Sequence, residues 1–197
     1  MKPIKEQLIE LIDEISNFED IKLSDIPCVD LYMDQVTTFF DDKLSPLKRD
    51  ADEKILTKTM INNYAKAKLL LPIKGKKYSK DQVVLLSLIY SLKQILSLND
   101  LNLILSPIIK NLSLDKENVS LDEIYNVFLH INKLQREEFN SWFKNKLQLV
   151  SEEAANIESE NGETIEVILT ILMLISSANA QKKMAEKIID KFLKPEK

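Results

Sequence analysis

The residues of this chain best suited to bind a ligand lie between positions 54 and 80, where eight lysines occur without an aspartate or a glutamate. The formal net charge of the whole chain is −4, so the residues outside this segment together carry −12. A strongly basic segment on an acidic protein is typical of a site that binds a polyanion. The segment also contains Asn62 and Asn63, and an asparagine amide can pair with two atoms of an adenine edge. These residue types indicate recognition of phosphates and bases.

Residues 57–70 are predicted to form the short helix that carries these donors. Thr57 is a suitable N-cap residue, and Pro72 lies just beyond the expected end of the helix. At about 3.6 residues per turn, Ile61 and Tyr64 fall on one side of this helix and the long polar side chains fall on the other. We expect the start of the helix to meet phosphate, because its dipole favours an anion there. The residues predicted to face DNA from this helix are Lys58, Thr59, Asn62, Asn63 and Lys66.

The next segment, residues 73–78, reads IKGKKY and is predicted to form a tight loop that works as a wing. Gly75 can take the positive φ that such a turn needs. If about five lysines of the basic segment neutralise phosphates, log affinity should fall with log salt at a slope of roughly −4 to −5. The wing is expected to contact phosphates in an adjacent groove, although a tyrosine is more often a core residue than a base stacker. Its predicted contact residues are Lys74, Lys76, Lys77 and Tyr78.

The rest of the chain is predicted to be helical, because it has only two glycines and six prolines and repeats apolar residues at helical spacing. Residues 4–18 and 31–44 both show this spacing. Later helices are expected to begin at capping boxes, in which a serine and a polar residue three positions later exchange hydrogen bonds. These pairs are Ser79 with Gln82, Ser97 with Asp100, and Ser120 with Glu123.

Breaks in the helical pattern divide the chain. Pro107 is expected to break one helix, and Asn161-Gly162 is expected to end the long helix that runs to about Ile157. The last helix then covers residues 163–192 and forms a hairpin with its predecessor. The predicted architecture is all-α in three parts: an N-terminal helix in residues 1–24, a winged helix-turn-helix domain in 25–110, and a helical dimerisation or effector domain in 111–197.

The sequence lacks the motifs that common catalytic and metal sites require. With Gly75 and Gly162 as the only glycines, glycine-rich phosphate loops are excluded. The single cysteine, Cys28, excludes an intramolecular disulfide and favours a reducing, cytoplasmic setting, and we expect it to be buried. His130 is the single histidine and has no cysteine near it in the sequence. We therefore predict a protein that is not an enzyme and holds no cofactor and no metal.

The most apolar stretch covers residues 167–175 and is interrupted only by Thr170. Because this stretch is shorter than the roughly 20 residues of a membrane span, we expect a buried core helix and no membrane association. One alternative is a dimer seam, since the small residues Ser176, Ser177 and Ala178 permit close approach of another helix. The other is a small apolar pocket for an effector. A homodimer is expected, with a small-molecule or protein effector at the C-terminal helices as a further option.

Two parts of the sequence resemble known regulators. Residues 64–72 read YAKAKLLLP and are followed by GKKY at 75–78, a capped helix, and LSLNDLNLIL at 96–105. This order resembles the N-terminal domain of MerR-type transcription regulators. The stretches DLYMDQV at 30–36 and TMINNY at 59–64 are similar to a family of bacterial MerR-like proteins known as a domain of unknown function. The resemblance covers about residues 28–108 and implies a winged helical DNA-binding domain.

The sequence departs from the MerR pattern at several positions. Lys68 stands where those regulators have a helix-ending glycine, Asn62 stands where they have an arginine, and Ser79 replaces the arginine after the wing tyrosine. The ten-residue polar connection at 45–54 is also longer than the usual turn between the first two helices. No metal-ligand motif of the metal-sensing members is present in the C-terminal hairpin.

The function predicted from the sequence is a cytoplasmic, sequence-specific DNA-binding regulator that acts on double-stranded DNA as a dimer. The alternative is a non-catalytic helical adaptor whose basic patch binds an acidic protein. The simplest competing explanation is a solvated lysine face that keeps an acidic protein soluble. The operator sequence, and whether the protein activates or represses, do not follow from these residues.

Overall fold

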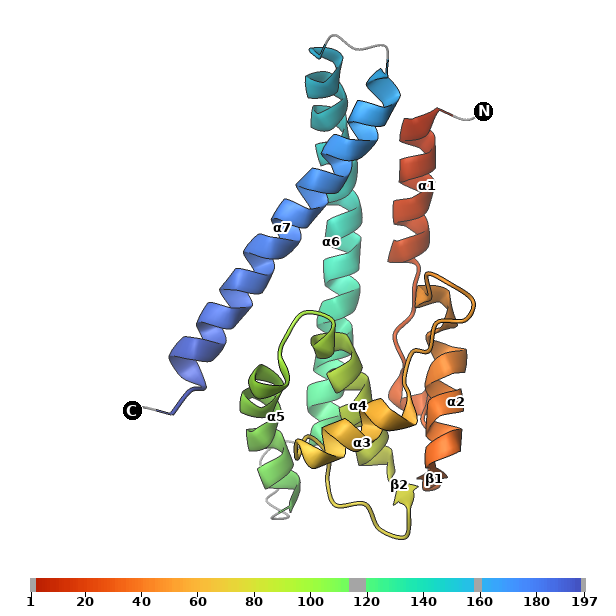
Figure 1. Ribbon diagram of the computed structural model, residues 1–197, viewed down its shortest axis with the longest axis vertical. Helices are drawn as coiled ribbons and strands as arrows, with labels where there is room; N and C mark the ends of the chain where they lie inside the picture. The colour runs from red at the N-terminus through yellow and green to blue at the C-terminus, as the bar shows by residue number, and fades with distance from the viewer. Residues whose placement is uncertain (1–2, 114–119, 158–160, 196–197) are drawn as a thin grey trace. The chain divides into compact units, whose positions relative to one another are not determined.

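The computed structural model describes residues 3–113, 120–157 and 161–195. The described chain is mostly helical, with one short antiparallel pair of strands, which confirms the all-α class predicted from the sequence (Figure 1). Two 3₁₀ turns, Leu23–Asp25 and Ser45–Leu47, connect the helices near the N-terminus. The elements in chain order are α1 (Ile4–Ser16), β1 (Leu31–Tyr32), α2 (Met33–Lys43), α3 (Lys58–Lys66), β2 (Lys77–Tyr78), α4 (Lys80–Lys93), α5 (Leu98–Ser113), α6 (Leu121–Ala155) and α7 (Gly162–Phe192).

The chain forms two compact units. The first unit combines residues 1–19 with 130–184, and the second combines residues 20–129 with 185–197. Helices α6 and α7 therefore contribute to both units. Each compact unit thus joins segments that are far apart in the sequence. The predicted domains are instead successive stretches of the chain, 1–24, 25–110 and 111–197, and this division stays a prediction.

The predicted capping boxes form and fix where the helices begin. The Ser79 amide donates to Gln82 Oε1 at 2.8 Å, and the Ser79 hydroxyl oxygen accepts from the Gln82 amide at 3.4 Å. The boxes that open α5 and α6 have the same reciprocal bonds, at 2.9 to 3.2 Å. Thr57 also caps α3 as predicted, since its Oγ1 accepts from the Met60 amide at 3.2 Å. These short-range bonds satisfy backbone donors that each first turn would otherwise leave unpaired.

One predicted helix boundary is wrong. Pro107 does not break the helix but lies inside α5, which continues to Ser113. A proline in a helix interior removes one donor and clashes with the carbonyl four residues earlier, so it needs a site where that carbonyl can be satisfied in another way. Pro107 is on the exposed side of α5, where solvent can reach the disturbed turn.

Helix α3 ends earlier than predicted, at Lys66 instead of about Leu70. Ala67 is its C-cap, and the next residue, Lys68, takes the left-handed conformation with φ of 59°. Glycine is the usual residue in this position because a Cβ disfavours left-handed backbone by roughly 1–2 kcal/mol. Because this position holds a lysine, the sequence does not indicate that the helix ends here.

Two hydrogen bonds hold the end of α3 in a Schellman motif. The Lys68 amide donates to the Ala65 carbonyl at 3.0 Å, and the Leu69 amide donates to the Tyr64 carbonyl at 3.0 Å. Leu69 is fully buried directly after the left-handed residue. The buried leucine and the two hydrogen bonds therefore hold Lys68 in its strained conformation.

We expect Lys68→Gly to stabilise the protein by about 0.5–1 kcal/mol, because glycine adopts left-handed backbone without the Cβ penalty but is more flexible when unfolded. Lys66→Gly, two residues earlier in the helix, should destabilise by a similar amount because it replaces a good helix former. Urea denaturation of both variants measures the difference. Equal destabilisation by both glycines would contradict the assigned strain at Lys68.

The second unit is built around α2, α3 and α4, with the strand pair beside them (Figure 1). Helix α4 is buried over most of its length, from Gln82 to Ile89, so it forms the centre of this core. The strand pair aligns Leu31 with Tyr78 and Tyr32 with Lys77. The largest side chains that are fully buried here are those of Val36, Phe40, Ile61, Leu69, Tyr78, Leu85, Leu86, Ile89, Leu101, Leu105 and Tyr125.

Tyr125 anchors the first turns of α6 in this core. Its side chain is 2% exposed, and its hydroxyl donates to the Ile21 carbonyl at 2.7 Å. Burial raises the pKa of Tyr125 to about 12. The tyrosine thus links two positions that are more than 100 residues apart in the chain.

The first unit packs α1 and α7 against the later part of α6. Its small core consists of Ile12, Phe143 and Leu147, with Met173 and Leu174 of α7 among the partly buried residues around it. Polar contacts tie the same helices together at the surface. Asp13 accepts from Lys144 Nζ at 2.7 Å and from Asn140 Nδ2 at 2.8 Å, and the Ser151 hydroxyl donates to Glu166.

The exposure of α7 contradicts the prediction of a buried core helix. Among the described residues, Met173 and Leu174 of α7 pack against the core of the first unit, whereas Ile168, Ile171, Leu172 and Ile175 are each at least half exposed. Of the helices in the described residues, α7 is the one that is long and apolar enough to cross a membrane by length and composition, and 6% of its most apolar window is buried. Core helices of soluble proteins meet the same criterion of length and composition, so it assigns no compartment.

Candidate nucleic-acid interface

Helix α3 has one buried face and one polar exposed face, as the sequence predicted. Ile61 and Tyr64 point into the core and are 0% and 3% exposed. Burial of Tyr64 raises the pKa of its phenol. All five residues that were predicted to face DNA from this helix are exposed: Lys58, Thr59, Asn62, Asn63 and Lys66.

The asparagines are free to recognise a ligand. Within the described parts of the chain, the side-chain amides of Asn62 and Asn63 form no hydrogen bond. Their backbones are held by the helix, so the amides project from a fixed scaffold. An exposed amide on a short, well-anchored helix can pair with an adenine edge if the helix enters a groove.

The segment after α3 forms a tight turn at its tip. Gly75 and Lys76 both have positive φ, 57° and 62°, and the Lys77 amide donates to the Lys74 carbonyl at 3.0 Å. Two consecutive positive φ values are the mark of a type I′ turn, the type that favours a hairpin. Lys74 and Lys77 form a bridge below the turn, and the loop between α3 and β2 extends away from the helices in Figure 1.

One buried glutamine closes the base of this loop. Gln82 is 3% exposed, and its Nε2 donates to the Leu71 carbonyl at 2.8 Å, while its Oε1 accepts from the Ser79 amide. The two ends of the segment from Leu71 to Ser79 are therefore held by the same side chain. This segment is called the wing loop below.

Tyr78 does not contribute to the exposed surface of the wing loop. Its side chain is 1% exposed and pairs across the strands with Leu31. Burial also raises the pKa of the Tyr78 phenol. The residue therefore supports the loop from the core, and its predicted role as a DNA contact needs correction because its ring is buried.

Half of the lysines in the basic segment interact with other groups of the protein. Lys58 forms an ion pair with Asp34 at the start of α2. The Lys77 ammonium lies over the ring of Tyr32, 5.0 Å from its centroid. Farther away, Lys80 forms an ion pair with Asp122, which raises the pKa of the lysine through a hydrogen bond.

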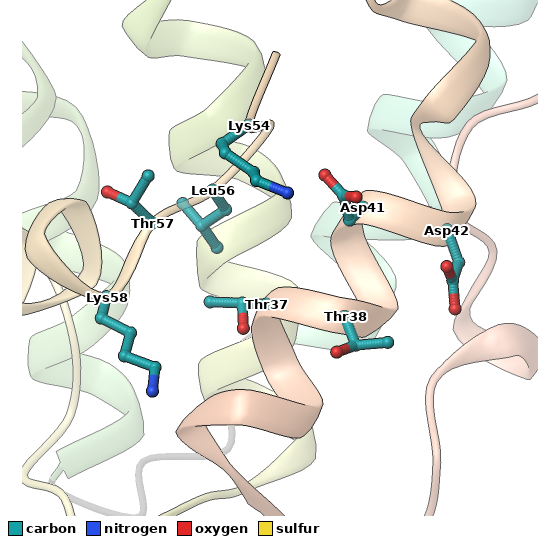
Figure 2. Close-up of a pocket in the computed structure, with 8 residues that line it drawn as sticks. All are labelled: Thr37, Thr38, Asp41, Asp42, Lys54, Leu56, Thr57 and Lys58. Atoms are coloured by element: carbon teal, nitrogen blue, oxygen red, sulfur yellow. The ribbon is translucent and has the colours of Figure 1, made fainter. Parts of the chain in front are cut away.

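Lys54 belongs to this group because it points toward Asp41 (Figure 2). Asp41 accepts from Lys48 at 2.8 Å, and this bond, with a smaller electrostatic contribution from Lys54, lowers the pKa of the carboxyl. Lys54 and Asp41 line a depression between α2 and the start of α3, together with Asp42. Both aspartates add negative charge to this depression and would repel a phosphate, so this side of α3 is not part of the candidate interface.

The other four lysines have no such partner. Lys66, Lys68, Lys74 and Lys76 are all exposed, and none forms an ion pair or hydrogen bond through its side chain within the described residues. They lie at the last turn of α3, at its left-handed cap and at the tip of the wing loop. We call them the unpaired lysines. Lys68 was absent from the residues predicted to touch DNA, although its place at the expected helix-ending glycine was visible in the sequence.

The remaining candidate residues form no second site. Cys28, which was expected to be buried, is exposed in the loop before β1. His130 is exposed on α6. A search of the described residues finds no group of three or more histidine, cysteine, aspartate or glutamate side chains that could hold a metal ion.

Comparison with known proteins identifies the family. No curated protein and no solved structure matches this chain. One family, described as Domain of unknown function (DUF1836), matches residues 21–128, a range that contains α2 through α5 and the first turns of α6. The exposed face of α3 and the wing loop both lie within this range. Because the match covers more than half of the sequence, the chain belongs to the DUF1836 family.

Proposed function

We propose that this protein is a sequence-specific DNA-binding transcription regulator of MerR-like type. The observation that carries the proposal is the pair of adjacent basic elements, an exposed Asn–Lys face on α3 followed by a hairpin turn with unpaired lysines. In the proposal, α3 enters the major groove and the wing loop contacts the phosphate backbone beside it. The protein acts without catalysis, cofactor or metal, in the cytoplasm where DNA is accessible.

The order of elements supports this assignment. A strand, a helix, a second short helix, a hairpin turn that pairs with the first strand, and a further helix follow one another from β1 to α4. This is the order of the winged helical module that the sequence resembles. Pairing of β1 with β2 supports the wing next to the N-terminus of α2.

The charges support it as well. Phosphate contacts supply much of the affinity of a DNA-binding protein. A lysine without a partner inside the protein breaks no ion pair or hydrogen bond when it binds a phosphate. The unpaired lysines alone give four such contacts, so we expect a slope of log affinity against log salt of about −3.6 per protomer. This value is smaller than the slope of roughly −4 to −5 expected from the sequence, because Lys58 and Lys77 already interact within the protein.

The second candidate function is an adaptor that binds an acidic protein through the same surface. It is supported by the ion pairs of Lys58 and Lys80, in which lysines of this segment already bind carboxylates. Such a protein would bind acidic partners with no preference among duplex DNA sequences.

The test is a selection from random duplex DNA with the purified full chain at two salt concentrations. The proposed function predicts enrichment of a defined sequence at both concentrations, in palindromic form if the protein binds as a two-fold dimer. Binding that is blind to sequence and disappears at the higher salt concentration would refute the regulator and favour the adaptor.

We expect Asn62→Ala or Asn63→Ala to relax base preference at a single position of the selected site. The loss on the preferred base should be about 1–3 kcal/mol, because one bidentate amide pair is removed. Lys76→Ala is the control and should weaken all sequences alike, since a phosphate contact carries no base information. Affinities for the selected site and for its single-base variants measure both effects. Equal losses on every sequence for the asparagine variants would contradict base recognition by α3.

A further inference from the structure

The exposed part of the wing loop has few contacts of its own. Every residue from Pro72 to Lys76 is exposed, and the bond from the Lys77 amide to the Lys74 carbonyl is local to the turn. The lysines at the tip therefore depend for their position on the two places where the loop leaves and re-enters the core. A loop that is held firmly at its ends loses less backbone freedom when it binds a ligand.

The C-terminal end of the loop is held by several contacts. Tyr78 is buried and pairs across the strands with Leu31. Lys77 pairs with Tyr32, and its ammonium lies 5.0 Å from the centroid of the Tyr32 ring. These contacts fix β2, so the loop re-enters the core at a defined point.

The N-terminal end of the loop depends on one side chain. Leu69 and Leu70 are buried, but Leu71 lies outside helix and strand, so its carbonyl has no partner in a regular hydrogen-bond pattern. That carbonyl accepts from Gln82 Nε2 at 2.8 Å. Within the described parts of the chain, Gln82 is the hydrogen-bond partner found for the stretch from Leu71 to Ile73.

Gln82 is itself held in one orientation. Its side chain is buried on the first turn of α4, and its Oε1 accepts from the Ser79 amide at 2.8 Å. Both ends of the side-chain amide are therefore used, one for each end of the wing loop. Another orientation of the side chain would leave a buried polar group unpaired, which is unfavourable.

We propose that Gln82 is a positioning residue for DNA binding, which holds the wing loop so that Lys74 and Lys76 reach the phosphate backbone from an ordered loop. The inference rests on the proposed function and names a buried residue on which the affinity supplied by these two lysines depends. Without the bond to the Leu71 carbonyl, the loop has to be ordered at the moment of binding, and this ordering opposes binding.

Two substitutions remove the bond to Leu71 in different ways. Gln82→Glu keeps an acceptor for the Ser79 amide but replaces the donor by an oxygen, whereas Gln82→Met is uncharged and unbranched and removes both bonds. Ser79→Ala is the matched control, because it removes the capping hydroxyl from the same helix start and leaves both bonds of the Gln82 side chain in place. Circular dichroism shows whether each variant is folded.

The first measurement is NMR relaxation of the backbone amides in the full chain without DNA. The order parameters of Lys74, Gly75 and Lys76 should lie near the rigid value of about 0.85 in the wild type and in Ser79→Ala, and below about 0.6 in both Gln82 variants. Order parameters that do not differ between the wild type and Gln82→Met would overturn the proposal.

The second measurement is the affinity for the DNA site that the wild type selects. Gln82→Met should lower this affinity about tenfold, which corresponds to the ordering of roughly one residue when DNA binds. In a Lys74→Gln/Lys76→Gln background the same substitution should change the affinity less than about twofold, because Gln82 acts through these lysines. A general loss of structure would lower the affinity equally in both backgrounds, and that result would contradict the proposal.

The outcomes separate this inference from the proposed function. A protein that selects a DNA site and loses affinity in the Lys74→Gln/Lys76→Gln variant, but not in Gln82→Met, would overturn the inference and leave the function standing. A wild type that selects no DNA sequence would overturn the function, and the order parameters would then still decide whether Gln82 holds the loop.

Discussion

Replacement of Lys66, Lys74 and Lys76 by glutamine is expected to lower the affinity for the selected DNA site about a hundredfold at 0.15 M salt. The three lysines have no partner within the described structure, so each can release one condensed counterion when it meets a phosphate. The same substitutions should reduce the slope of log affinity against log salt by about 2.7. Fluorescence anisotropy titrations over a range of salt concentrations measure both quantities.

A matched variant separates position from net charge. Replacing Lys54, Lys58 and Lys80 by glutamine removes the same three charges from the same segment, but these lysines interact with Asp41, Asp34 and Asp122. We expect the slope to change by less than about 1, because the carboxylates already neutralise them. If both triple variants lost the same affinity and the same slope, binding would depend on overall charge, and the candidate interface would be wrong.

Loss of the Tyr125 ring is expected to have the largest effect on stability. Tyr125→Ala should lower the free energy of unfolding by about 3–5 kcal/mol, because it empties a fully buried site in the second unit. Tyr125→Phe keeps the ring but leaves the buried Ile21 carbonyl without its 2.7 Å donor, and should lower stability by about 1–3 kcal/mol. Urea denaturation followed by circular dichroism measures both. An effect of Tyr125→Ala below that of Tyr125→Phe would contradict the packing described here.

The same residue makes stability depend on alkaline pH. The ordinary tyrosine pKa of 10.0 applies to the unfolded chain, and burial raises that of folded Tyr125 to about 12. Between these values the unfolded state releases the proton and the folded state keeps it, so fewer protons are bound in the unfolded state and stability falls as pH rises. Below pH 10 this contribution is fully present.

Tyr64, Tyr78 and Tyr90 titrate in the same direction because burial also raises their pKa values. The difference between wild type and Tyr125→Phe isolates the contribution of Tyr125. The wild type should lose more stability than the variant between pH 10 and 12. Parallel loss in the two proteins would contradict the burial of this phenol.

Local signals in the sequence predicted much of the fold. A serine followed three positions later by a polar residue contains both partners of a capping box, so the starts of α4, α5 and α6 were correct. The two faces of α3 were also predicted, because a period of 3.6 residues decides which side Ile61 and Asn62 take. These features depend on neighbours within one or two helical turns.

Features that depend on distant residues were not predictable in the same way. The partners of Lys58 and Lys80 are 24 and 42 positions away, so the sequence could not separate paired from unpaired lysines. Burial of Tyr78 follows from the pairing of β1 with β2, and the exposure of α7 depends on which distant segments pack against it. The end of α3 at Lys68 was missed for another reason, since tertiary packing of Leu69 overrides the preference of lysine.

The hydrogen bonds of Gln82 have a consequence for how the DUF1836 domain can change during evolution. A single side chain anchors both Leu71 and Ser79, so the scaffold fixes the two ends of the wing loop and leaves the residues between them exposed, except at Lys77 and Tyr78. Substitutions and length changes at the tip therefore leave the core of α2, α3 and α4 intact. The residues at the tip of the wing loop can therefore change while the framework that holds the loop stays the same.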